Sequence, residues 1–205
     1  TAVGRSALYA NRTGSENVAV GSYALDANTT GTRSTAVGAF ALTSTTTAND
    51  NTAVGYAALE NNTTGYYNTA VGRDAMEDNT TGNNNASLGT FALEANTTAS
   101  DNTACGYAAM VNNTEGFQNT ALGSNSLRTN TTGDNNVAVG YGALYSATTA
   151  NDNTAVGRDA LNDNTTGTRN TAVGAYSLDA NTSANDNTAF GYQTLTNLNA
   201  GNSNT

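Results

Sequence analysis

The sequence predicts an all-β protein: a parallel β-solenoid of twelve 17-residue coils that forms a single domain over residues 1–205. Glycine recurs every seventeen residues from Gly4 to Gly191, with no insertion or deletion. Leu or Met follows each of these glycines by four residues, and an apolar residue precedes it by one. The unit is too short for a helix pair, and its Gly, Asn and Thr are poor helix formers. The last coil, at about 192–205, departs from the pattern, because Leu198 replaces the usual Asn.

The composition alone would suggest disorder. Leu, Val and Phe together make 28 of the 205 residues, Ile is absent, and the net charge is −9. Few apolar residues and a high net charge are typical of chains that cannot bury a core. The strict period argues against disorder, because it is typical of units that stack on their neighbours.

Several function classes are excluded or disfavoured by the residue types. His and Lys are absent and all seven basic residues are Arg, which excludes a His-based metal site or base and a Lys nucleophile. The acidic balance argues against nucleic-acid binding, which needs a basic face. No apolar run is long enough to span a bilayer, so we expect no membrane insertion by this segment. The repeat has few local departures that could form an active site, and we therefore predict that the chain is not an enzyme.

The coil that begins at Asn51 illustrates the expected local structure. Residues 52–54 are predicted as one strand and residues 56–59 as a second, with a corner glycine between them. This corner role is assigned to Gly55, Gly72, Gly106 and Gly157. The two apolar columns are predicted to fill the coil, and they include Val54, Leu59, Val71, Met76, Val156 and Leu161.

The residue between Thr52 and Val54 is then expected to face outward, because side chains alternate along a strand. It is Ala in eleven of the twelve coils. Ala offers little to a solvated strand face, so we predict that a second copy of the chain covers this face. The expected interface contains Ala53, Ala70, Ala104, Ala121, Ala155 and Ala172.

Two Asn columns are predicted to form hydrogen-bonded ladders along the stack. One precedes the strand and includes Asn51, Asn68 and Asn102, and the other opens the following turn and includes Asn62, Asn79 and Asn96. Equivalent residues of stacked coils lie about 4.7–4.8 Å apart, within reach of side-chain hydrogen bonds. Twelve coils at this spacing predict a rod roughly 57 Å long.

The turn has two sequence forms, one with Gly, as at Gly65, and one with Ala followed two residues later by Asp. The Ala form occurs at Ala48, Ala99, Ala150 and Ala184. Gly accepts positive φ more readily than Ala, so the two forms are predicted to differ in backbone. The Asp is predicted to bond nearby backbone amides. The single cysteine, Cys105, stands in an apolar column and is predicted to be a small core residue rather than a reactive thiol.

Three surface features leave alternatives open. Glu60, Glu77 and Glu94 recur in one column of consecutive coils; solvated charge is the favoured interpretation, with a calcium site as the alternative, and no cofactor is predicted. Exposed Tyr side chains can bind carbohydrate or another protein, or pack between subunits. The columns at Thr63 and Thr64 raise an ice-binding surface as a minor alternative.

The segment Asn51-Thr52-Ala53-Val54-Gly55-Tyr56-Ala57-Ala58-Leu59 and its copies resemble the head repeats of YadA-like trimeric autotransporter adhesins. They are also similar to the NTAVG-type repeats of phage tail fibres and bacterial surface fibres that end in an intramolecular chaperone. The resemblance covers essentially all twelve coils. It implies a left-handed parallel β-roll, assembled as a trimer, on an extracellular fibre, a cell surface or a virion tail fibre.

The expected function is therefore that of a structural segment, a stiff rod of an extracellular fibre or adhesin. Its main expected partner is itself, in a homo-oligomer such as a trimer or in a filament. The alternative is a surface-binding module that recognises a host surface, matrix or glycan.

Overall fold

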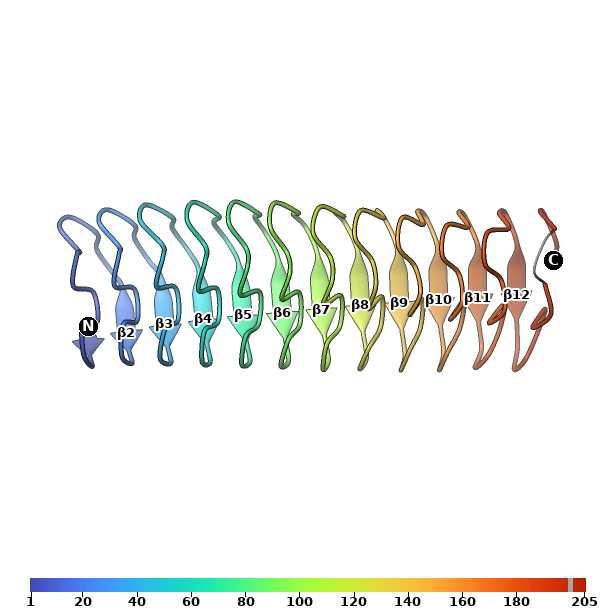
Figure 1. The fold of residues 1–205 in the computed structure, drawn as a ribbon, viewed down its shortest axis with the longest axis horizontal. Helices are drawn as coiled ribbons and strands as arrows, with labels where there is room; N and C mark the ends of the chain where they lie inside the picture. The colour runs from blue at the N-terminus through green and yellow to red at the C-terminus, as the bar shows by residue number, and fades with distance from the viewer. Residues whose placement is uncertain (199–200) are drawn as a thin grey trace.

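The computed structural model describes residues 1–198 and 201–205 and shows a rod of stacked coils, with the two termini at opposite ends (Figure 1). Each coil contributes one short strand. The twelve strands pair in chain order in a single sheet, and every pair is parallel. The prediction of an all-β parallel solenoid with a 17-residue repeat is confirmed.

The strands are two or three residues long and their spacing is regular. They are β1 (Ala2–Val3), β2 (Val18–Val20), β3 (Thr35–Val37), β4 (Thr52–Val54), β5 (Thr69–Val71), β6 (Ala86–Leu88), β7 (Thr103–Cys105), β8 (Thr120–Leu122), β9 (Val137–Val139), β10 (Thr154–Val156), β11 (Thr171–Val173) and β12 (Thr188–Phe190). Each residue pairs with the residue seventeen positions further on, as Ala53 does with Ala70. Equivalent residues therefore form continuous columns along the rod.

The predicted second strand does not exist, because the chain turns at these positions. Ala57 and Leu59 both have φ of 53°, in the left-handed region, and residues 56–61 form turns. Alternating left-handed residues cannot form an extended strand. The turn also explains why the Leu59 column contains only Leu and Met: β-branched side chains are strongly disfavoured at positive φ.

The anchor glycines occupy the corner between strand and turn, as predicted. Gly55, Gly72, Gly106 and Gly157 have φ of 145°, 143°, 139° and 135°, a conformation that L side chains rarely adopt. A Cβ on Gly55 would also collide with the carbonyl oxygen of Gly72 in the next coil. The corner therefore needs glycine for its backbone angle and for close stacking.

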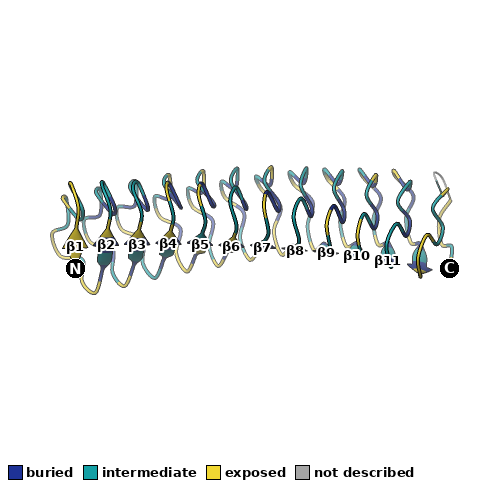
Figure 2. Ribbon diagram, turned by 90° about the horizontal axis from the view of Figure 1, so that it is seen from below, coloured by how far each residue is buried: buried dark blue, intermediate teal, exposed yellow. Residues whose placement is uncertain are grey.

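The predicted inside and outside of the strand are reversed in the structure. Ala53 is fully buried, whereas Val54 is 36% exposed. The inward Ala residues include Ala53, Ala70, Ala104, Ala121, Ala155 and Ala172, and the outward column includes Val54, Val71, Val156 and Cys105. Figure 2 shows the resulting mixture of buried and exposed residues within single coils.

The physical reason is the narrowness of a coil with only one strand. The strand packs against the row of Leu59, Met76 and Leu161, which are fully buried as predicted, and an Ala side chain fills the space between them. A second Ala column, three residues after the anchor glycine, is also buried and was not predicted as core; it includes Ala24, Ala41, Ala58, Ala75, Ala92 and Ala109. Two columns of Ala and one of Leu or Met thus form the apolar interior.

Leu198, which replaces Asn in the last coil, packs partly buried against the core. The neighbouring Asn199 and Ala200 lie outside the described residues.

Candidate interaction surfaces

The first predicted Asn ladder is present and buried. The Oδ1 of Asn51 accepts the backbone N–H of Asn68 at 2.9 Å, and the Nδ2 of Asn51 donates to the carbonyl of Gly65 at 2.8 Å. Asn102 makes the same two bonds, to the backbone N–H of Asn119 and the carbonyl of Gly116. Each amide therefore joins two coils and also crosses the interior of its own coil.

The second ladder runs in parallel and uses direct amide–amide bonds. The Nδ2 of Asn79 donates to the Oδ1 of Asn62 at 2.7 Å, and the Nδ2 of Asn96 donates to the Oδ1 of Asn79 at 2.7 Å. The Nδ2 of Asn62 also donates to the Gly65 carbonyl at 3.0 Å, so this carbonyl accepts from both ladders. All these Asn side chains are buried. The ladders supply the hydrogen bonds that these buried amides would otherwise have to make with water.

The second ladder has two gaps, and each leaves one oxygen without a partner. Thr45 stands between Asn28 and Asn62, and Ala147 stands between Asn130 and Asn164. The buried Oδ1 atoms of Asn28 and Asn130 have no hydrogen-bond donor. The gaps are therefore unfavourable positions in an otherwise satisfied interior.

The two turn forms share one backbone, contrary to the prediction. The turn glycines, such as Gly65, lack positive φ, and the left-handed residue lies two positions later, at Asp50 or Tyr67 alike. Asp is favoured there because it accepts the left-handed conformation. In place of the predicted bonds to backbone amides, Asp50 makes a bidentate contact with Arg33 of the preceding coil at 2.7 and 2.8 Å, and Asp101 accepts from the Nδ2 of Asn84 at 3.1 Å.

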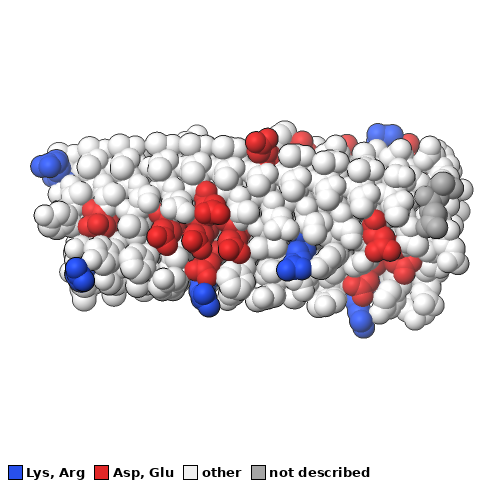
Figure 3. All heavy atoms as spheres, viewed as in Figure 1, with Lys and Arg blue, Asp and Glu red and all other residues white. Residues whose placement is uncertain are grey.

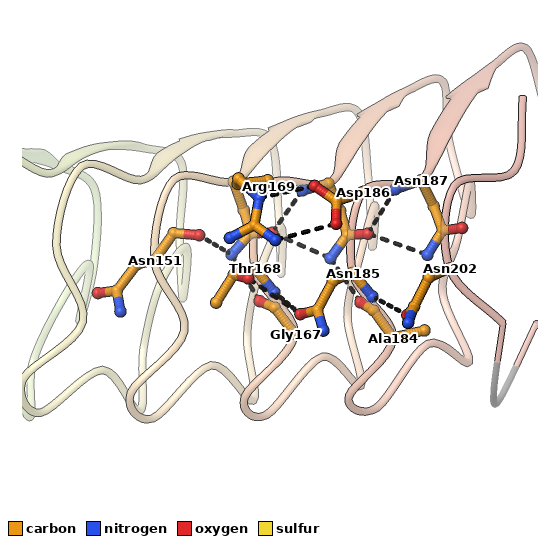
Figure 4. Close-up of polar contacts among 11 residues, drawn as sticks. Asn151, Gly167, Thr168, Arg169, Ala184, Asn185, Asp186, Asn187 and Asn202 are labelled. Atoms are coloured by element: carbon orange, nitrogen blue, oxygen red, sulfur yellow. Dashed lines mark hydrogen bonds and ion pairs between the residues drawn. The ribbon is translucent and has the colours of Figure 1, made fainter.

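A third polar column was not predicted from the sequence. The Oδ1 of Asn185 accepts the backbone N–H of Thr168 at 2.7 Å, and the Oδ1 of Asn202 accepts that of Asn185 at 2.8 Å (Figure 4). Arg169 and Asp186 lie beside this column and repeat the Arg33–Asp50 pair. The column varies between Asn, Ser, Thr, Asp, Tyr and Phe, which explains why the repeat pattern alone does not reveal it.

The outward strand face carries a row of apolar residues beside a row that is mostly Thr. We use this name for the first and third residues of the strands, which flank the inward Ala. Val3, Val20, Val37, Val54, Leu88, Leu122 and Phe190 on this face are 36–67% exposed. No strand carries a charged residue. At Ala86, where Thr is replaced, a shallow hollow lies between Val71, Leu88 and Cys105.

A separate edge, formed by the turns after the anchor glycines, carries Arg and aromatic residues. The guanidinium of Arg73 lies over the ring of Phe91 at 5.6 Å, and Phe91 meets Tyr107 edge-on at 5.8 Å. The same arrangement recurs five coils later. Arg158 lies over Tyr176 at 5.4 Å, and Tyr176 meets Tyr192 at 6.2 Å.

Acidic side chains gather beside both Arg–aromatic groups, and Figure 3 shows two red patches on one face of the rod, each with a basic residue at its lower rim. In the first group, partial burial raises the pKa of Glu60, Glu77 and Glu94 above the ordinary value, and the negative charges of Asp74 and Asp78 raise it further. The negative charges of these carboxylates therefore exceed the positive charge that lies close to them.

No set of three or more Cys, Asp or Glu in the described ranges is arranged to hold a metal ion. Within the same ranges, no helical segment has the length and apolar character needed to cross a bilayer. Comparison of the chain with protein-family models, curated proteins and solved structures finds no match.

Proposed function

We propose that the chain is a non-enzymatic structural segment, a stiff rod of an extracellular fibre or adhesin, whose copies associate through the outward strand face. The observation that carries this proposal is the uncharged row of Val, Leu, Cys and Phe along the sheet, whose side chains are exposed or partly exposed. A continuous apolar patch of this kind is rare on a monomeric soluble protein and is typical of an interface.

The size of the outward strand face supports self-association. Twelve strands at about 4.8 Å give a length of roughly 57 Å, and two rows of side chains give a width of roughly 12 Å. The resulting area of about 700 Å² per copy is close to the roughly 800 Å² per partner of a stable interface. A trimer around a parallel axis, which the repeat resemblance implies, would divide this face of each copy between its two neighbours, at about 350 Å² for each contact.

The test is the mass of the purified chain in solution, measured by light scattering. We expect a defined oligomer, and we expect Val54→Arg to reduce it to monomers without loss of β structure. Thr64→Arg is the matched control, because Thr64 is exposed in a turn outside the face. A monodisperse wild-type monomer would refute self-association. The inward Ala53 is not a suitable test, because a large side chain there would disrupt the coil itself.

Ice binding is the second candidate, and we propose the outward strand face for it instead of the Thr63 and Thr64 columns. The hydroxyl of Thr63 donates to the carbonyl of Thr80 at 2.9 Å, so this turn column has its hydroxyls engaged by backbone. The outward strand face instead presents rows of Thr and Val at regular spacing on a parallel sheet. Ice crystals that become faceted in the presence of a monomeric chain, and not of Thr52→Lys, would favour this candidate; unaltered crystal growth would reject it.

A further inference from the structure

We propose that the hollow beside Tyr176 is a binding site for a neutral glycan. The hollow has a volume of about 350 Å³ and is lined by Asp159, Asn162, Asp163, Tyr176, Asp179 and Ala180. It lies on the turns of two neighbouring coils, away from the strand residues of the outward strand face. Its size matches that of a small-molecule site, and its lining combines an aromatic wall with several polar groups.

The polar groups of the hollow are almost all acceptors. The Oδ1 of Asp179 is enclosed and has no donor, and Asp163 is exposed at the rim. The Nδ2 of Asn162 is already engaged by the Gly142 carbonyl at 3.0 Å and by Asp159 at 3.4 Å. The enclosed Oδ1 of Asp179 is out of reach, so a ligand in the hollow must donate hydrogen bonds to the accessible carboxylate oxygens of the lining.

A metal ion does not fit this requirement, because the carboxylates of the described residues form no group able to hold one. Separated carboxylates around an aromatic wall fit a pyranose, whose hydroxyls donate to different acceptors while its C–H face packs on a ring. Asp159 is paired with Arg158 at 3.1 Å, so Asp163 and Asp179 leave the hollow negative. This charge disfavours uronic, sialic or sulfated sugars.

The same composite occurs a second time on the rod. Arg73, Asp74, Asp78, Phe91 and Glu94 occupy the positions of Arg158, Asp159, Asp163, Tyr176 and Asp179, five coils earlier. The Arg–carboxylate pair and the Arg–aromatic contact are both present there, Arg73–Asp74 at 2.9 Å and Arg73–Phe91 at 5.6 Å. The coil itself does not need these residues, because Ser, Ala and Thr occupy the same Arg column elsewhere. Five coils separate the two groups by about 24 Å, so one extended glycan chain can reach both.

The experiment measures retention of the full chain on immobilised cellulose, chitin, starch and mannan, with polygalacturonate as the anionic comparison. We expect retention on at least one neutral polysaccharide and weaker retention on polygalacturonate. Tyr176→Ala and Asp179→Asn should each weaken binding about tenfold or more, without changing the oligomer mass. Ala occurs in the Tyr176 column at Ala57 and Ala108, so Tyr176→Ala is compatible with the fold. Tyr66→Ala removes an exposed Tyr outside the hollow and is the matched control.

Three outcomes would overturn the proposal. The first is no retention on any neutral polysaccharide, and the second is an equal loss in Tyr176→Ala and Tyr66→Ala. The third is binding that a chelator abolishes, because that would place a metal ion between protein and ligand. Failure here leaves self-association through the outward strand face intact, since the light-scattering result does not depend on the hollow.

Discussion

The enclosed columns and the outward columns of this rod follow different rules. At the inward position of the strand, Ala recurs in every coil except one, where Ser87 replaces it. The adjacent outward column contains Val, Leu, Cys and Phe. The enclosed positions must fit a fixed narrow space, and the outward positions meet no such limit. The difference teaches that the interior determines the coil geometry, while the outward columns carry the variation that can serve binding and assembly.

The largest expected effect is the difference in stability between a Leu substitution on the inward side of the strand and one on the outward side. Ala53→Leu adds three carbons to a space that an Ala side chain fills, and should cost about 3 kcal/mol by overpacking. Val54→Leu adds one carbon to an exposed side chain and should change stability by less than about 0.5 kcal/mol. Urea unfolding of both variants measures the difference. Similar losses in the two variants would contradict the enclosure of Ala53 and the exposure of Val54.

The Asn ladders allow a second comparison, between an enclosed amide and an outer one. Asn79→Ala removes the bonds to Asn62 and to the Gly82 carbonyl, and leaves the Nδ2 of Asn96 without its ladder acceptor. We expect a loss of about 2–3 kcal/mol. The side chain of the outer Asn83 accepts one bond, from the Tyr66 amide, and Asn83→Ala should cost less than about 1 kcal/mol. Equal midpoints in thermal unfolding would contradict a structural role for the ladder.

The gap at Ala147 offers a gain in stability. Ala147→Asn would supply a donor to the orphaned Oδ1 of Asn130 and an acceptor to the Nδ2 of Asn164, and should stabilise the rod by about 1 kcal/mol. The control is Ala143→Asn, the same change in an apolar buried column, where a new amide finds no ladder and should destabilise. The unfolding midpoints of the two variants should therefore shift in opposite directions.

The smallest expected effect concerns the acidic group on the outer surface. The pKa of Glu77 is raised in the folded state, so the native state binds more protons than the unfolded state once the pH rises past the ordinary value of 4.5. Stability should therefore fall as pH rises through the folded pKa. Glu77→Gln should flatten this decline and stabilise the chain at pH 7 by less than about 1 kcal/mol, because the side chain is only partly buried and solvent screens its charge. Parallel melting temperatures of wild type and variant from pH 4 to pH 7 would contradict the shift.

The fold could be predicted from the sequence because the 17-residue period leaves few architectures and the stacking follows from it. The ladders were predictable because Asn in the same column of consecutive coils meets its own copies. The predicted inside and outside of the strand were wrong because Val is more hydrophobic than Ala, and hydrophobicity alone places Val in the core. The informative signal was instead volume: the Ala53 column never exceeds Ser in size, whereas the Val54 column extends to Phe.

The left-handed turn residues and the hollow beside Tyr176 could not be predicted, because both depend on how the coils stack. The left-handed residues at Ala57 and Leu59 could not be predicted, since Leu normally avoids positive φ and a column of Leu and Met is equally typical of an ordinary core. The hollow beside Tyr176 is lined by residues from two coils, and their side chains meet only when the coils stack. Arg158 and Tyr176 are eighteen positions apart, one more than the period, and a search along single columns does not pair them.

The position of the termini at opposite ends of the rod has a mechanical consequence. Each coil advances the rod by about 4.8 Å, but its seventeen residues extend to roughly 56–61 Å when pulled straight. Tension between the ends should therefore unfold the terminal coils one at a time. Each unfolded coil then spans more than ten times the length that it occupied along the rod. A rod built in this way should yield under load in steps of one coil.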